Sequence, residues 1–158
     1  MNDRLAKEVI KDLIQTHLED PMRQWKDTPR NWVHTDTPIV SATFPRIEVI
    51  KRGRTNNNII SMGFKFWEQK EIILDIAFWT KVGFKWKNDD DVYFKDEKLV
   101  EEYLGKIWTE AIKPYGEWLR DTYKIIGLKN LGEAEGKYDE ERQLFKGIVS
   151  VRIWYFDK

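Results

Sequence analysis

The side chains that could bind a metal ion or transfer a proton are few and scattered along this sequence. It contains two histidines, His17 and His34, and no cysteine, so thiolate zinc sites, disulfides and a cysteine nucleophile are excluded. His17 closes a predicted helix, where a cationic imidazole suits the helix dipole. His34 has only Asp36 nearby and lacks further ligands at metal-binding spacing. Neither histidine predicts a metal site.

The acidic residues offer two further candidates for metal chemistry. The run 89–91 consists of three aspartates but lacks the alternating ligands and distal glutamate of a calcium loop, so it predicts a solvated turn. Glu48, Lys51 and Asp75 resemble the acid–acid–lysine cluster of restriction-type nucleases, in which carboxylates hold a divalent ion beside the scissile phosphate. Lys51 follows Glu48 by three residues, however, so the two side chains point to opposite faces of a strand.

Other catalytic signatures do not occur in the sequence. It has no Gly-rich phosphate loop and no nucleophilic serine motif. We therefore expect no enzyme, no cofactor and no bound metal.

Composition bounds the class of protein. The 158 residues are 41% apolar and 34% charged, which suits one globular domain with a sizeable core. The 27 basic and 27 acidic residues give a formal net charge of zero, so the chain lacks the basic excess typical of nucleic-acid binding. No signal peptide and no apolar run long enough to span a bilayer is visible. We expect a soluble protein that does not bind membranes.

The N-terminal region predicts a helix followed by a long connection. Apolar residues recur with helical spacing over 3–18, and Asn2 or Asp3 can cap the helix. Residues 21–43 contain three prolines without a clear period, which predicts a surface loop. Trp25 and Trp32 in this loop must be covered by the domain itself or by a neighbour.

The centre of the chain predicts strands. Residues 44–52 predict an opening strand, and Gly and Asn residues over 53–58 predict a turn. Alternating apolar residues over 60–66 and 72–78, with a turn at 68–70, predict an antiparallel hairpin.

The last third predicts a helix, an acidic loop and a final strand. The helix begins near residue 96, is kinked or restarted by Pro114, and has Gly127 as its expected stop. The polar segment 132–143 predicts a loop. Residues 148–156 alternate clearly and predict a strand tied into the sheet.

The order α-β-β-β-α-β predicts a single two-layer α+β domain over residues 1–158. Its four-stranded, mainly antiparallel sheet is covered on one face by two helices. If the alternation is in register, the other face carries Trp79, Trp154 and Phe156 among polar residues. We expect another subunit to cover such a face.

This layout resembles that of the tail-terminator family of tailed phages and archaeal tailed viruses, and of related tail-completion (neck) proteins. The similarity lies in the helix, the long loop, the opening strand with the sequence FPRIEV (44–49), the hairpin, the long helix and the closing run GIVSVRIWY (147–155). The resemblance covers nearly the whole chain as topology. It implies no catalytic residues.

The resemblance implies a structural virion protein, assembled in the host cytoplasm. Such proteins form a ring, commonly of six subunits, that terminates the tail tube and contacts the head connector. Identical subunits in a ring need heterologous, closing interfaces, for which the candidate residues are Trp25, Trp32, Trp79, Trp154 and Phe156. The acidic segment would line the channel and limit its contact with DNA to a passive one, through Glu133, Glu135, Asp139, Glu140 and Glu141.

Two other hypotheses remain open from the sequence. The chain fits a small non-enzymatic protein-interaction module, such as an adaptor or inhibitor. It also fits, less well, a metal-dependent nuclease built on Glu48 and Asp75.

Overall fold

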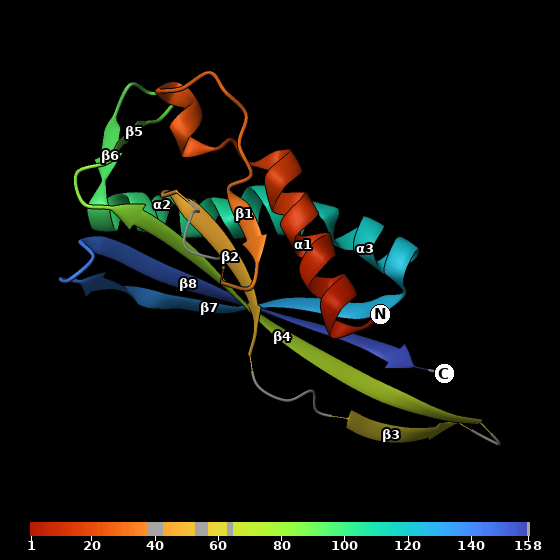
Figure 1. The fold of residues 1–158 in the computed structure, drawn as a ribbon. Helices are drawn as coiled ribbons and strands as arrows, with labels where there is room; N and C mark the ends of the chain where they lie inside the picture. The colour runs from red at the N-terminus through yellow and green to blue at the C-terminus, as the bar shows by residue number, and fades with distance from the viewer. Residues whose placement is uncertain (38–42, 53–56, 63–64, 158) are drawn as a thin grey trace.

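The two clearest alternating segments form the spine of the main sheet. The computed structural model describes residues 1–37, 43–52, 57–62 and 65–157, and their side chains outside 57–62, 65–68, 135–136 and 157. Strands β4 (Lys65–Lys81) and β8 (Leu144–Asp157) pair antiparallel from Glu68 opposite Asp157 to Lys81 opposite Leu144. Figure 1 shows them as two long neighbouring ribbons that reach across the molecule.

The main sheet has six strands in the described part of the chain. Besides β4 and β8 it contains β1 (Val33–Thr35), β2 (Arg46–Lys51), β3 (Asn57–Met62) and β7 (Ile125–Asp139). The order is β1-β2-β4-β8-β7, with β3 paired to the first part of β4, and only β1–β2 is parallel. The α+β class and the mainly antiparallel sheet are therefore confirmed, whereas the predicted number of four strands is wrong.

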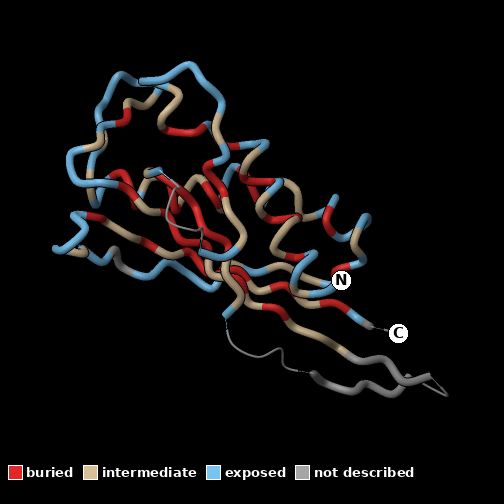
Figure 2. Tube along the Cα trace, viewed as in Figure 1, coloured by how far each residue is buried: buried red, intermediate tan, exposed pale blue. Residues whose placement is uncertain are grey.

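Helices cover one face of this sheet. Helix α1 (Asp3–His17) starts as predicted, because the Asn2 side chain accepts a 2.8 Å hydrogen bond from the Leu5 backbone N–H. In Figure 1, α1, α2 (Asp96–Lys106) and α3 (Gly116–Tyr123) all lie on the same side of the strands. Buried positions concentrate between the two layers in Figure 2.

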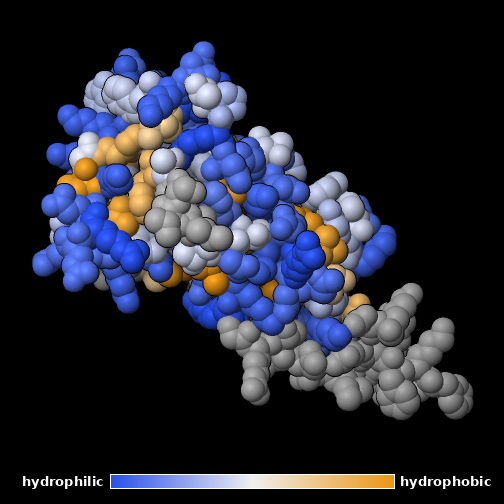
Figure 3. All heavy atoms as spheres, viewed as in Figure 1, coloured by the Kyte–Doolittle hydropathy of each residue, from blue (hydrophilic) through white to orange (hydrophobic). Residues whose placement is uncertain are grey.

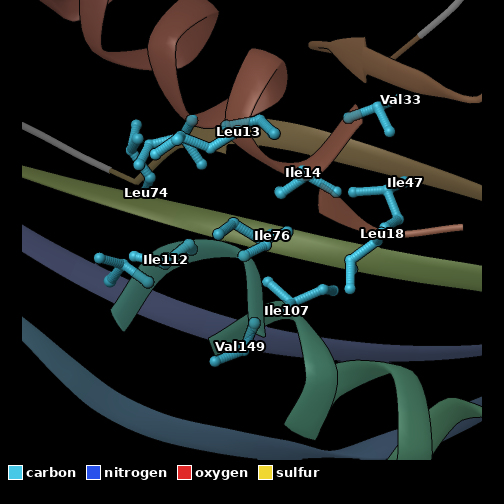
Figure 4. Packing of buried hydrophobic residues seen from close by; sticks show 14 of the residues in the cluster. Leu13, Ile14, Leu18, Val33, Ile47, Leu74, Ile76, Ile107, Ile112 and Val149 are labelled. Atoms are coloured by element: carbon cyan, nitrogen blue, oxygen red, sulfur yellow. The ribbon is translucent and has the colours of Figure 1, made fainter. Parts of the chain in front are cut away.

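The core joins both layers. Figure 4 shows Ile14 of α1 and Ile107 facing Ile76 and Val149 of the sheet. All four side chains are fully buried. Burying such side chains is the main favourable term in folding.

Pro114 divides the second helical region. Helix α2 continues as a π-helical segment, η2 (Ile107–Ile112), and then as a 3-10 turn, η3 (Lys113–Tyr115), before α3 begins. Proline lacks the N–H that a continuing helix needs, so the helix restarts there. Gly127 does not end the helix, contrary to prediction. Lys124 does so in the left-handed conformation, at φ 56°, and Gly127 lies in β7.

The predicted turn at 68–70 is wrong. These residues lie inside β4, where they pair with β3 on one side and with β8 on the other. Three polar residues do not interrupt a strand when neighbours on both sides satisfy its backbone. The antiparallel β3–β4 pair instead begins with Met62 opposite Lys65. Most of the turn predicted at 53–58 lies outside the described residues.

Two predicted loops contain regular structure. Segment 21–43 includes a 3-10 helix, η1 (Pro21–Gln24), and β1, which is too short to show a period. Segment 132–143 is largely part of β7, because an edge strand tolerates polar residues on both faces. A small separate sheet, β5 (Lys85–Lys87) with β6 (Tyr93–Lys95), lies beside η1.

Candidate functional site on the open face of the sheet

The predicted tryptophans Trp79 and Trp154 lie on the sheet face opposite the helices. Phe78 and Tyr155, their neighbours in β4 and β8, are buried toward the helices, so both tryptophans point the other way. We call this second surface the open face. It is formed by the outward side chains of β2, β4 and β8, which include the apolar Ile50, Ile73, Ala77 and Ile148 beside Arg46, Glu48, Glu71, Asp75, Trp79, Lys146, Ser150, Arg152, Trp154 and Phe156.

The two tryptophans stand at opposite ends of the open face. Trp79 lies opposite Lys146 in the strand register, and Trp154 lies opposite Glu71. Lys146 and Trp154 are eight residues apart on β8, which corresponds to roughly 26 Å along a strand. Each tryptophan therefore has its own surroundings.

A buried carboxylate holds Trp79 in place. The Trp79 indole Nε1 donates a 2.8 Å hydrogen bond to Glu48 Oε2, and Arg46 donates one of 3.0 Å to Glu48 Oε1. Glu48 is only 2% exposed, so these partners compensate its lost hydration. The Arg46 guanidinium also lies 4.3 Å from the Phe44 ring centre. The indole thus has one fixed orientation.

A surface cavity opens beside Trp79. Its volume is about 430 Å³, and it is lined by Trp79, Lys137, Tyr138, Asp139, Glu140, Glu141 and Lys146. Lys146 Nζ lies 4.6 Å from the Trp79 ring centre, a cation–π contact. The structure thus brings one predicted interface residue together with three predicted channel-lining residues. Lys137, Tyr138 and Lys146 also belong to this group, and no pattern in the sequence predicts them there.

The middle of the open face is an ion-paired network. Arg52 Nε donates to Asp75 Oδ2 at 3.0 Å, and the Ser150 hydroxyl donates to Asp75 Oδ1 at 2.7 Å. The same hydroxyl accepts a 2.7 Å hydrogen bond from Arg52. Asp75 is therefore already neutralised by a guanidinium.

The nuclease-like cluster is not assembled around a common point. Glu48 is bound to Arg46 and Trp79, whereas Asp75 belongs to the separate Arg52 network. Lys51 is ion-paired with Asp3 of α1, on the helix side of the sheet. Across the described residues, no group of three or more His, Cys, Asp or Glu side chains could hold a metal ion.

At the other end, Trp154 packs on a glycine. A Cβ built on Gly127 would lie 2.1 Å from the Trp154 ring, so any side chain there would displace the indole. The Arg152 guanidinium lies 5.2 Å from the Trp154 ring centre and donates to Glu71 Oε2 at 2.6 Å. Phe156 beyond it is 36% exposed. No local sequence pattern indicates this packing role of Gly127, because its partner lies on another strand.

Trp25 and Trp32 do not belong to the open face. Trp32 is 2% exposed and packs edge-to-face against Tyr103, with ring centres 6.2 Å apart. Its prediction as an interface residue is therefore wrong, since the subunit's own core covers it. Trp25 is 54% exposed on the small lobe formed by η1, β5 and β6, where its Nε1 donates to the Lys85 carbonyl at 2.7 Å.

The predicted channel-lining residues do not share one face. Glu133 lies opposite Val149, whose side chain points to the helices, and is exposed at the β7 edge. Asp139 ends β7, and Glu140 and Glu141 lie exposed in the turn to β8. The side chain of Glu135 lies outside the described residues.

His34 borders the Trp79 end of the open face. It pairs with Glu48 in the β1–β2 register, and its Nε2 is buried without a hydrogen-bond partner among the described residues. Burial lowers the pKa of His34 below its ordinary value of 6.5, and the positive charge of Arg46 acts in the same direction. The imidazole is therefore neutral at pH 7.

Comparison with protein-family models and with curated proteins found no match for this chain. Within the described residues, no helix has the length and apolar character needed to cross a membrane.

Proposed function

We propose that this chain is a structural virion protein of the tail or neck, which assembles into a ring, commonly of six copies. The observation that carries the proposal is the open face, which helices leave uncovered and which carries a tryptophan at each end. In this proposal the ring terminates the tail tube and joins it to the head connector.

The two tryptophans have the properties of interface anchors. Both are only half-buried in the single chain, and both are already oriented, Trp79 by Glu48 and Trp154 by Gly127. Large aromatic side chains dominate binding energy at interfaces, and a fixed rotamer lowers the entropy lost on association. A neighbouring subunit would cover both tryptophans of the open face with a different surface of its own. Such a head-to-tail interface between two different surfaces is what ring closure requires.

The charges around Trp79 suit the rim of such an interface. Lys137 and Lys146 line the same cavity as Asp139, Glu140 and Glu141, so both signs are present within one small surface. Opposite charges on a neighbour would fix the register of docking more than the affinity. We infer that the exposed glutamates of the 140–143 turn face the channel, where they discourage DNA from adhering.

A second candidate is a protein-interaction module that binds one partner as a monomer. The Trp79 cavity favours this function, because a single pocket with an oriented aromatic wall suits one inserted side chain. The geometry does not favour the nuclease, since Glu48 and Asp75 lie in separate ion pairs.

Native mass distinguishes the two candidates. Light scattering coupled to size exclusion, followed by negative-stain imaging, is expected to show a closed ring. A monomer at every concentration, with no ring on imaging, would contradict self-assembly and favour the single-partner module.

A further inference from the structure

A second aromatic site lies between α1 and α3, on the helical layer and away from the open face. It is a surface groove of about 350 Å³ whose lining includes Asp12, His17, Tyr115, Trp118 and Tyr123. Figure 3 shows hydrophobic side chains reaching the surface where α1 meets α3. The proposed ring function does not use this groove.

The aromatic walls of the groove are fixed by two ring pairs. Tyr115 stacks on His17 with ring centres 3.9 Å apart, and its hydroxyl lies 2.8 Å from His17 Nδ1. Trp118 and Tyr123 meet at 81° with ring centres 5.5 Å apart, so they form a corner. Trp118 remains 45% exposed although it has a ring neighbour. The rings therefore form a preformed concave surface.

One carboxylate faces these rings without a partner. Asp12 lines the groove and is exposed, and within the described part of the chain it forms no ion pair or hydrogen bond. Two other acidic side chains of α1 and α3 are engaged, Glu8 with Lys11 and Asp121 with Arg120. Among the described residues, the other titratable ones that line the groove are His17, Tyr115 and Tyr123. The groove thus offers aromatic rings and one unpaired negative charge.

We propose that this groove binds an arginine side chain presented by a partner protein. A guanidinium stacks on aromatic rings through cation–π attraction and pairs with a carboxylate through its planar donors. An apolar side chain would use the rings but leave Asp12 unpaired. An ammonium group would pair with Asp12 as a point charge without the flat stacking surface. The arginine is therefore the ligand that satisfies both parts of the groove.

The test is titration of the purified chain with N-acetyl-arginine amide, followed by the Trp118 indole N–H signal in NMR. The signal is assigned by its loss in Trp118→Phe. The comparison probes are N-acetyl-lysine amide, neutral N-acetyl-norleucine amide and tetramethylammonium. A saturable shift that is largest with the arginine probe is expected.

Variants locate the site. Asp12→Asn, followed at the Trp118 indole N–H, and Trp118→Leu, followed at the Tyr123 ring signals, should each weaken binding of the arginine probe by roughly two- to fivefold, because exposed ion pairs and cation–π contacts contribute modestly. Asp121→Asn removes a carboxylate from α3 outside the groove and should leave binding unchanged. All three positions are exposed, so circular dichroism should show an unchanged fold.

Three outcomes would overturn the proposal. Equal shifts with the norleucine probe would mean that the groove is only apolar. A stronger response to tetramethylammonium would assign it to free quaternary amines. No saturable shift with any cation would show that the groove does not bind the guanidinium group.

Discussion

Trp79 and Glu48 are joined by a 2.8 Å hydrogen bond from the indole Nε1 to Oε2, although they lie on different strands. The carboxylate also binds Arg46 and is almost fully buried. One buried acid therefore couples the stability of the sheet to the orientation of a surface tryptophan.

Replacement of Glu48 by Ala is expected to destabilise the fold by about 3 kcal/mol, because it removes a buried carboxylate that pairs with Arg46 and accepts a hydrogen bond from the Trp79 indole. Urea unfolding measures this loss. Glu133→Ala, at an exposed position of the β7 edge, should change the free energy of unfolding by less than about 0.5 kcal/mol. Similar values for the two variants would contradict the structural role of Glu48.

Replacement of Gly127 by Ala is expected to expel the Trp154 ring, because the added Cβ would overlap it. We expect a destabilisation of about 1–3 kcal/mol. Most of this loss should disappear in the Trp154→Ala background, which a double-mutant cycle measures.

Gly105→Ala in α2 is the matched control, because nothing lies within 4 Å of its added Cβ. Because Gly105 lies within a helix, this change should stabilise the fold by about 0.5–1 kcal/mol. A Gly127→Ala cost that persists without the Trp154 ring would place the strain elsewhere.

His34 makes stability depend on pH. Because its pKa in the folded state lies below 6.5, the unfolded chain binds the proton first as the pH falls. The free energy of unfolding that neutral His34 contributes is therefore fully present above pH 6.5. It is lost as the pH falls toward the folded-state pKa of His34. Urea unfolding across this window should show the loss in the native chain and in His17→Gln, but a flatter profile in His34→Gln. An unchanged profile in His34→Gln would contradict this account.

Substitutions of Trp25 and Trp32 by Ala are expected to differ sharply in how much they lower the free energy of unfolding. Trp32→Ala removes a ring that is packed in the core against Tyr103, and should cost about 3–5 kcal/mol. Trp25→Ala removes a half-exposed ring with one hydrogen bond to the Lys85 carbonyl, and should cost less than about 1.5 kcal/mol. Thermal unfolding of the two variants compares them directly.

The alternation of β4 and β8 could be predicted because one face of each strand is buried under helices. Leu74 and Val151 needed only the period of two to be assigned to the core, and the same period assigned Trp79 and Trp154 to the open face. Asn2 was recognisable as a cap because the rule involves neighbouring residues.

The errors have a common physical cause, which is stabilisation by distant partners. The polar residues at 68–70 form strand because β3 and β8 pair with them on both sides. Trp32 is core because Tyr103, far along the chain, packs against it. The cavity beside Trp79 combines Lys137 and Lys146 across the β7–β8 pair, which no local pattern reveals.

The most direct test of ring assembly through the open face is the native mass of the double variant Trp79→Ser/Trp154→Ser, measured beside the unmodified chain. Val92→Ser is the control, because Val92 is an exposed apolar residue, 51% accessible, between β5 and β6 and outside the main sheet. Rings in the unmodified chain and in Val92→Ser, with monomers in the double variant, are the predicted result. Rings that persist in the double variant would contradict the open face as the assembly surface, and monomers throughout would contradict self-assembly itself.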